Sequence, residues 1–93
     1  MRKTGEFDAW LTGLRDAKAL AKIITRIQRL ELGNVGDVKA VGGGGSEMRI
    51  DYGPGYRVYY KQIGKALVLL LCGGDKTTRA QDIKRAKQLA AEL

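Results

Sequence analysis

The residues best suited to chemistry on an anion lie in the second half of the chain. Arg49 and Arg57 fall on two neighbouring strand-like segments, where their guanidinium groups can approach one another closely. Two cations so placed repel unless an anion lies between them. That anion is either a carboxylate of the same segments, from Glu47 or Asp51, which makes an ion-pair ladder, or a bound phosphate, whose oxygens match the guanidinium fork. The residues alone leave both alternatives open.

Two more side chains are candidates for the same face of the predicted sheet. Lys76 follows an apolar strand, at a position from which a side chain can reach over the end of a sheet. Tyr59 lies two residues after Arg57, so the alternation of a strand places both on one face. There its ring could stack on a base, or its hydroxyl could donate a proton. The other three tyrosines fall on the apolar face of the strands and are expected to pack in the core.

The composition restricts the chemistry that the protein can use. Its 93 residues include 17 Lys and Arg, 10 Asp and Glu, one Cys and no His, which gives a formal net charge of +7. Without His, the Ser-His-Asp and Cys-His mechanisms are excluded, and a single Cys makes neither an internal disulfide nor a cysteine-rich zinc site. We expect no metal and no cofactor. The excess positive charge indicates an anionic partner, either nucleic acid or an acidic protein, although charges scattered over solvated faces would also account for it.

Hydrophobic spacing predicts the elements that must position these groups. Apolar residues recur at helical spacing over 7–14, 20–30 and 83–93, with Asp16 as a candidate cap of the second helix and a candidate capping box from Thr78 to Gln81 before the third. Between the second and third helices, strand-like segments lie at 38–41, 46–52, 56–63 and 66–72. The four glycines 42–45 are expected to form a hairpin loop. The last of these strands is continuously apolar, which is typical of a strand covered on both faces.

This order of elements predicts a single α+β domain over residues 1–93. We expect a helical hairpin and a C-terminal helix packed on one face of a small, mainly antiparallel twisted sheet. The opposite face, with Arg49, Arg57 and Tyr59, is expected to stay open. On the second helix, four cations follow one another along one side, either as a solvated face or as a binding surface: Lys18, Lys22, Arg26 and Arg29. The longest apolar run is about a third of a membrane span, and residues 1–6 lack the apolar core of a signal peptide, so no membrane association is expected.

Three segments in the second half of the chain resemble a known family. Residues 47–50, 52–60 and 69–76 read Glu-x-Arg-Ile, Tyr-Gly-Pro-Gly-Tyr-Arg-Val-Tyr-Tyr and Leu-Leu-Leu-x-Gly-Gly-Asp-Lys. Together with residues 7–16 and 33–39, they resemble the RelE/ParE superfamily of bacterial toxins, and most closely its short HigB-like branch, the addiction module killer proteins. The resemblance covers nearly the whole chain in order.

The resemblance implies a cytoplasmic toxin of a toxin–antitoxin module. A cognate antitoxin, expected to carry a helix-turn-helix DNA-binding domain, would hold the toxin inactive, and operator DNA would be bound only through that antitoxin. RelE-type members cut mRNA on the translating ribosome without a metal, by activating the ribose 2′-hydroxyl and forming a cyclic phosphate. ParE-type members instead inhibit DNA gyrase and have no enzymatic activity. The first activity is our leading expectation, and the second is the alternative.

The family's site residues can be carried over only where this sequence matches. Arg57 matches the arginine of the Gly-Tyr-Arg turn, Arg49 falls where RelE-type enzymes carry a strand lysine, and Lys76 falls near the basic residue after the last strand. Because an arginine does not release its proton, the general base would then be Lys76 or Lys39. No Tyr or His follows in the C-terminal helix, where many members carry the general acid, so Tyr59 is the candidate substitute. The family also begins with a strand, for which only residues 1–4 are available here.

Overall fold

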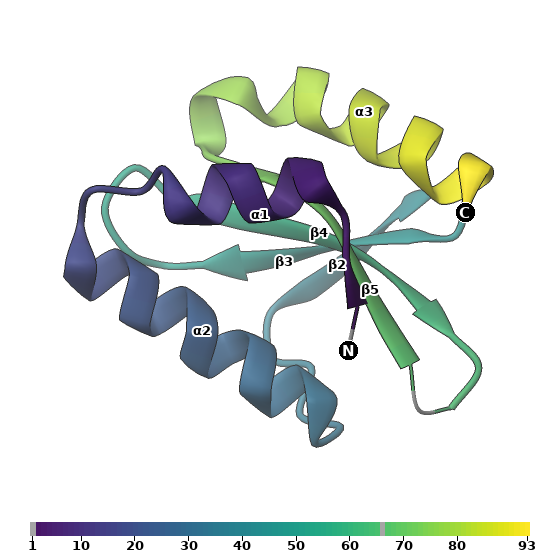
Figure 1. The fold of residues 1–93 in the computed structure, drawn as a ribbon, viewed down its shortest axis with the longest axis horizontal. Coiled ribbons are helices and arrows are strands. Elements are labelled where there is room, and N and C mark those ends of the chain that lie inside the picture. Colours follow the sequence, from purple (N-terminus) through teal and green to yellow (C-terminus); the bar gives the residue numbers. More distant parts are fainter. Residues whose placement is uncertain (1, 66) are drawn as a thin grey trace.

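The computed structural model describes residues 2–65 and 67–93, and Figure 1 shows its elements. In chain order these are β1 (Arg2–Lys3), α1 (Gly5–Thr12), α2 (Ala17–Glu31), β2 (Val38–Gly42), β3 (Gly45–Ile50), β4 (Tyr56–Ile63), β5 (Leu67–Gly74), the 3₁₀ turn η1 (Lys76–Thr78) and α3 (Arg79–Glu92). The α+β class is confirmed, and the four strands predicted from the sequence begin and end within two residues of the expected bounds. Ala66, expected to begin the last strand, lies outside the described residues. A short first strand, β1, is present within residues 1–4, where the family resemblance implied one.

The strands form one five-stranded mixed sheet in the order β1-β5-β4-β3-β2. β1 runs parallel to β5, and the remaining pairs are antiparallel. The glycine loop is the hairpin turn that the sequence predicted, since β2 ends at Gly42 and β3 begins at Gly45. Gly43 and Gly44 have φ of 64° and 85°, and two successive residues with positive φ are the requirement of a tight type I′ hairpin, which glycine meets at no steric cost.

The helices cover both faces of the sheet, so the expectation that they all pack on one face is wrong. α1 packs mainly on β5 and α2 on β3, while α3 packs on β5 and β4. The core on the side of α1 and α2 contains Phe7, Ile23, Ile27, Leu30, Met48, Ile50, Val58, Tyr60, Val68 and Leu70. The core under α3 contains Tyr59, Leu69, Leu71, Cys72, Ala86, Leu89 and Ala90. The physical reason lies in β5, which is apolar on both of its faces and therefore needs a helix on each. In Figure 1, α2 and α3 lie far apart with strands between them.

Two consecutive glycines let both layers of helices approach the end of β5. A Cβ on Gly73 would lie 2.2 Å from the ring of Trp10 in α1, and a Cβ on Gly74 would lie 1.8 Å from the carboxylate of Asp82 in α3. Real Cβ atoms do not approach other atoms so closely, so any side chain here would push a helix away.

The helix caps agree with the sequence in one case and differ in another. Asp16 caps α2 as predicted, because its side chain accepts hydrogen bonds from the backbone N–H groups of Lys18 and Ala19. Thr78 is the N-cap residue of α3 as predicted, but the capping box predicted there is absent, because the Thr78 side chain makes no cap hydrogen bond to α3. Asp75 instead caps η1 in a capping box that has Thr78 as its third residue, so the box lies three residues before the predicted one. Among the described residues, no helix is long and apolar enough to cross a membrane.

Candidate anion-binding site

Three of the predicted site residues line one groove of about 400 Å³ at the end of the sheet. Arg49 and Arg57 are direct partners across β3 and β4, as the alternation predicted. Lys76 comes from η1 and is brought to them by the turn between these strands: its backbone N–H lies 3.4 Å from the carbonyl oxygen of Pro54, and its Cβ lies 3.4 Å from where a Cβ on Gly55 would be. We call this space the anion groove. Its full lining is Asp37, Arg49, Ile50, Asp51, Gly53, Pro54, Gly55, Arg57 and Lys76.

A buried glutamate lies beside the anion groove and gathers three arginines. Glu47 has no exposed surface. Its Oε1 accepts a hydrogen bond from Nε of Arg49 at 3.2 Å, and its Oε2 lies 2.9 Å from Nε of Arg79 and 4.0 Å from Nε of Arg57. The hydroxyl of Tyr59 donates to Oε2 at 3.0 Å. The carboxylate therefore lies within 4.0 Å of three guanidinium groups and accepts a hydrogen bond from one hydroxyl.

These contacts keep Glu47 ionised although it is buried. Burial raises the pKa of a carboxyl group, but here the hydrogen bonds from Arg49, Arg79 and Tyr59 outweigh burial and hold the pKa of Glu47 below its ordinary value of 4.5. Three guanidiniums against one carboxylate leave two positive charges around Glu47, and Lys76 adds a third, while Asp37 and Asp51 of the lining offset two of these. The carboxylate ladder and the phosphate site thus need not exclude one another.

Only one of the two carboxylates expected between the arginines takes that place. Glu47 does so, but Asp51 lies beyond the end of β3, and no described hydrogen bond or ion pair joins it to Arg49 or Arg57. It lines the anion groove as an exposed acid instead. A ladder of two acids and two arginines is therefore not what the structure contains.

Tyr59 shares the sheet face of Arg57, as predicted, but that face is not open at Tyr59. Its side chain is fully buried beneath α3, in the core that contains Leu89 and Ala90. Burial and the hydrogen bond to Glu47 raise the pKa of Tyr59 strongly. The expectation that Tyr59 stacks on a base or donates a proton from an open face is therefore wrong, because no ligand reaches it and its proton is held by Glu47.

The remaining candidate, Lys39, is exposed and lies apart from the anion groove. It pairs with Glu47 in register across β2 and β3, which places it in the same row as Tyr59. It is not among the residues that line the anion groove. Sequence reasoning also missed Arg79, the first residue of α3, which contacts Glu47 through two nitrogens. The sequence feature that pointed to Arg79 was the apolar run of β5, because a strand that is apolar on both faces needs a helix on its second face, and Arg79 begins that helix.

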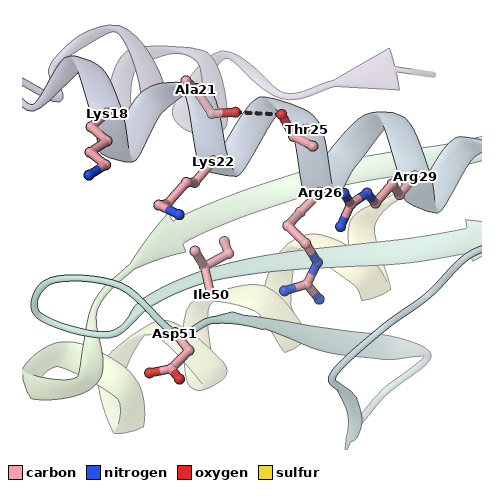
Figure 2. A pocket seen from close by; sticks show the side chains of 8 residues that line it. All are labelled: Lys18, Ala21, Lys22, Thr25, Arg26, Arg29, Ile50 and Asp51. Carbon is pink, nitrogen blue, oxygen red and sulfur yellow. Dashed lines mark hydrogen bonds between the residues drawn. The ribbon is translucent and has the colours of Figure 1, made fainter.

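A second groove, of about 470 Å³, runs along α2 and contains the predicted stripe of cations. Figure 2 shows Lys18, Lys22, Arg26 and Arg29 on this helix, with Ile50 and Asp51 opposite. Nζ of Lys22 lies 5.3 Å from the ring centre of Tyr52. Arg26 donates from Nη1 to the backbone carbonyl oxygen of Arg49 at 2.6 Å, so α2 supports the strand that carries the anion groove. Ile50 and Asp51 line both grooves.

Comparison with known proteins shows that the chain is similar in sequence to a bacterial protein. A protein of Haemophilus influenzae, described as an uncharacterized protein, is 55% identical over 93 residues, which are all of this chain and 94% of that protein. No family model matches the chain, and no solved structure matches it. Identity at this level over the full length means that the chain belongs to the same protein family as the Haemophilus influenzae protein.

Proposed function

We propose that the protein is the toxin of a bacterial toxin–antitoxin module, with a RelE-like fold, and that it cuts mRNA on the translating ribosome. The observation that carries the proposal is the convergence of Arg49, Arg57 and Lys76 on one groove that is open to solvent. A phosphodiester is the anion that such a groove suits, because guanidinium groups match phosphate oxygens in two-bond geometry and a lysine adds a mobile charge. A gyrase inhibitor would have no need of cations gathered in this way.

The proposed reaction is an internal transfer of the phosphodiester. A base removes the proton of the ribose 2′-hydroxyl, the 2′-oxygen forms a bond to the adjacent phosphorus, and the bond from phosphorus to the 5′-oxygen breaks. That oxygen takes up a proton, so the products are a 2′,3′-cyclic phosphate and a 5′-hydroxyl. Negative charge builds on the phosphate oxygens in the transition state, where Arg49 and Arg57 would stabilise it.

In the proposed reaction Lys76, and not the arginines of the groove, transfers the protons. Lys76 is exposed at the mouth of the anion groove, and an amine can release and accept a proton, whereas a guanidinium does not. Lys39 is the second candidate, but its side chain would have to extend to the anion groove from the neighbouring row of the sheet. Tyr59 takes no part, since it is buried and bound to Glu47.

The proposal includes the cytoplasm as the place of action and an antitoxin as the partner. The antitoxin is expected to bind operator DNA itself, through a helix-turn-helix domain, and to lay an acidic or amphipathic segment on the toxin's basic surface. Two surfaces offer the charge for this: the groove along α2 and the anion groove. Positive charges on both would favour fast encounter with an acidic segment.

The test is a translation reaction with the purified protein, followed by mapping of the mRNA ends. We expect cuts in phase with codons, a 5′-hydroxyl on each downstream fragment, and no cuts with Arg57→Ala protein. Intact mRNA, together with trapped breaks in DNA bound to gyrase, would refute the ribonuclease and favour the ParE-like alternative.

A further inference from the structure

Glu47 meets its arginines in one consistent way. In each of the three pairs the closest nitrogen is Nε, at 3.2 Å for Arg49, 2.9 Å for Arg79 and 4.0 Å for Arg57. Within residues 2–65 and 67–93, neither Arg49 nor Arg57 donates a hydrogen bond from its terminal nitrogens to the protein, and those nitrogens are not buried. Glu47 therefore holds the inner edge of the Arg49 guanidinium by a hydrogen bond and attracts that of Arg57 by charge alone, since Nε of Arg57 makes no hydrogen bond. The outer ends of both guanidiniums are left for solvent or a ligand.

The same geometry removes Glu47 from the list of possible bases. A general base must reach the proton that it removes, and Glu47 has no exposed surface. Both of its oxygens already accept hydrogen bonds, from Arg49, Arg79 and Tyr59. The side chain is thus placed to act on the arginines and not on a substrate.

We propose that Glu47 is the positioning residue of the anion groove: its buried carboxylate sets the guanidiniums of Arg49 and Arg57 so that their outer nitrogens point at one phosphate. Arg79 and Tyr59 hold the carboxylate in turn. Preorganised donors bind an anion more tightly than donors that must be ordered at the moment of binding. The inference takes the phosphate ligand from the proposed function, but it concerns binding alone and does not require that RNA is cut.

Positioning and simple charge counting predict opposite results for one substitution. Glu47→Gln keeps the size of the side chain and removes its negative charge, so the groove becomes more positive by one unit. If charge alone governs binding, or if Glu47 serves only the stability of the fold, the folded variant binds phosphate as tightly as the wild type or more tightly. If Glu47 positions the arginines, binding weakens, by about tenfold on the scale of supporting residues around metal sites.

The experiment is a titration of the purified protein with inorganic phosphate, followed by NMR of backbone amides and arginine Nε–H groups. The matched control is Asp51→Asn, which removes an exposed carboxylate that lines the same groove without holding either arginine. We expect Glu47→Gln to weaken phosphate binding about tenfold, and Asp51→Asn to tighten it. Unchanged or tighter binding by folded Glu47→Gln protein would overturn the inference.

A second variant decides the matter if Glu47→Gln does not give a native spectrum. Tyr59→Phe keeps every charge and removes one hydrogen bond to Glu47. We expect phosphate to bind more weakly to this variant than to the wild type, because the carboxylate is held less firmly. Binding equal to that of the wild type would overturn the inference. Failure of mRNA cleavage by the wild type, with phosphate binding that follows these expectations, would refute the proposed function and leave the positioning role standing.

Discussion

The substitution Arg57→Ala separates the activity of the anion groove from the stability of the fold. In the wild-type protein the side chain of Arg57 is only 12% exposed, and its Nε lies 4.0 Å from Oε2 of Glu47. Truncation therefore removes packing as well as charge, but Arg49 and Arg79 still neutralise Glu47, so no buried charge is left unpaired. We expect a loss of about 1–2 kcal/mol in the free energy of unfolding, within the ordinary range of single substitutions. A domain of this length has about 5–14 kcal/mol in total, so the variant should stay folded.

The effect on cleavage should be much larger than the effect on folding. Loss of one donor to the charge of a transition state costs about 2.7–4 kcal/mol, or a rate 10²–10³ times lower. The assay is single-turnover mRNA cleavage on programmed ribosomes, with urea unfolding of the same samples. Arg85→Ala is the matched control, since Arg85 is an exposed arginine of α3 that pairs with Glu6, and neither residue lines the groove. Cleavage at the wild-type rate by folded Arg57→Ala protein would show that the groove is not the active site.

The other predictions concern the lysine, the pH dependence and the partner. If Lys76 transfers a proton, Lys76→Arg should slow single-turnover cleavage nearly as much as Lys76→Ala; if it only holds phosphate, Lys76→Arg should keep much of the rate. Arg49→Lys restores the residue type of RelE-type enzymes and should retain cleavage in the same assay, so complete loss would contradict the assignment. Because the folded-state pKa of Glu47 lies below its ordinary value of 4.5, the stability that this group contributes is present above that pH and is lost as the pH falls through the folded-state pKa. Urea unfolding of wild type and Glu47→Gln between pH 7 and 3 measures this, and equal slopes would refute it. Binding of the antitoxin, followed by stopped flow, should slow as salt is added, and a rate independent of salt would argue against electrostatic docking.

Local patterns in the sequence predicted most of the strands and the pairing of the site. The alternation of β3 places Met48 in the core with α2 and Glu47 on the opposite face, as the period of two requires. The same alternation on β4, with the short turn between the strands, sets Arg49 against Arg57. These features depend on residues close together in the chain, so a pattern of a few residues is enough to determine them.

The position of α3 was not predicted, because it depends on contacts between distant residues and not on a local pattern of its own. Its apolar stripe showed that one face is buried but not which face of the sheet it covers. The continuous apolar run of β5 contained that information, since a strand apolar on both faces needs cover on both. Following that rule to its end would have buried Tyr59 and brought the start of α3, with Arg79, to Glu47.

This two-sided architecture bears on the choice between the proposed functions. A sheet face left fully open could hold scattered cations simply because they are solvated, and their convergence would then mean little. Here α3 closes most of that face, and the cations remain at its uncovered end, where Arg57 is mostly buried and its Nε is without a hydrogen-bond partner. A buried guanidinium is costly unless its charge is used, and Glu47 compensates only one of the three arginines around it. Arg57 is thus mostly buried and without a hydrogen bond at the place where η1, β3 and β4 meet, an arrangement expected of a binding site for an anion and not of a surface that is charged for solubility.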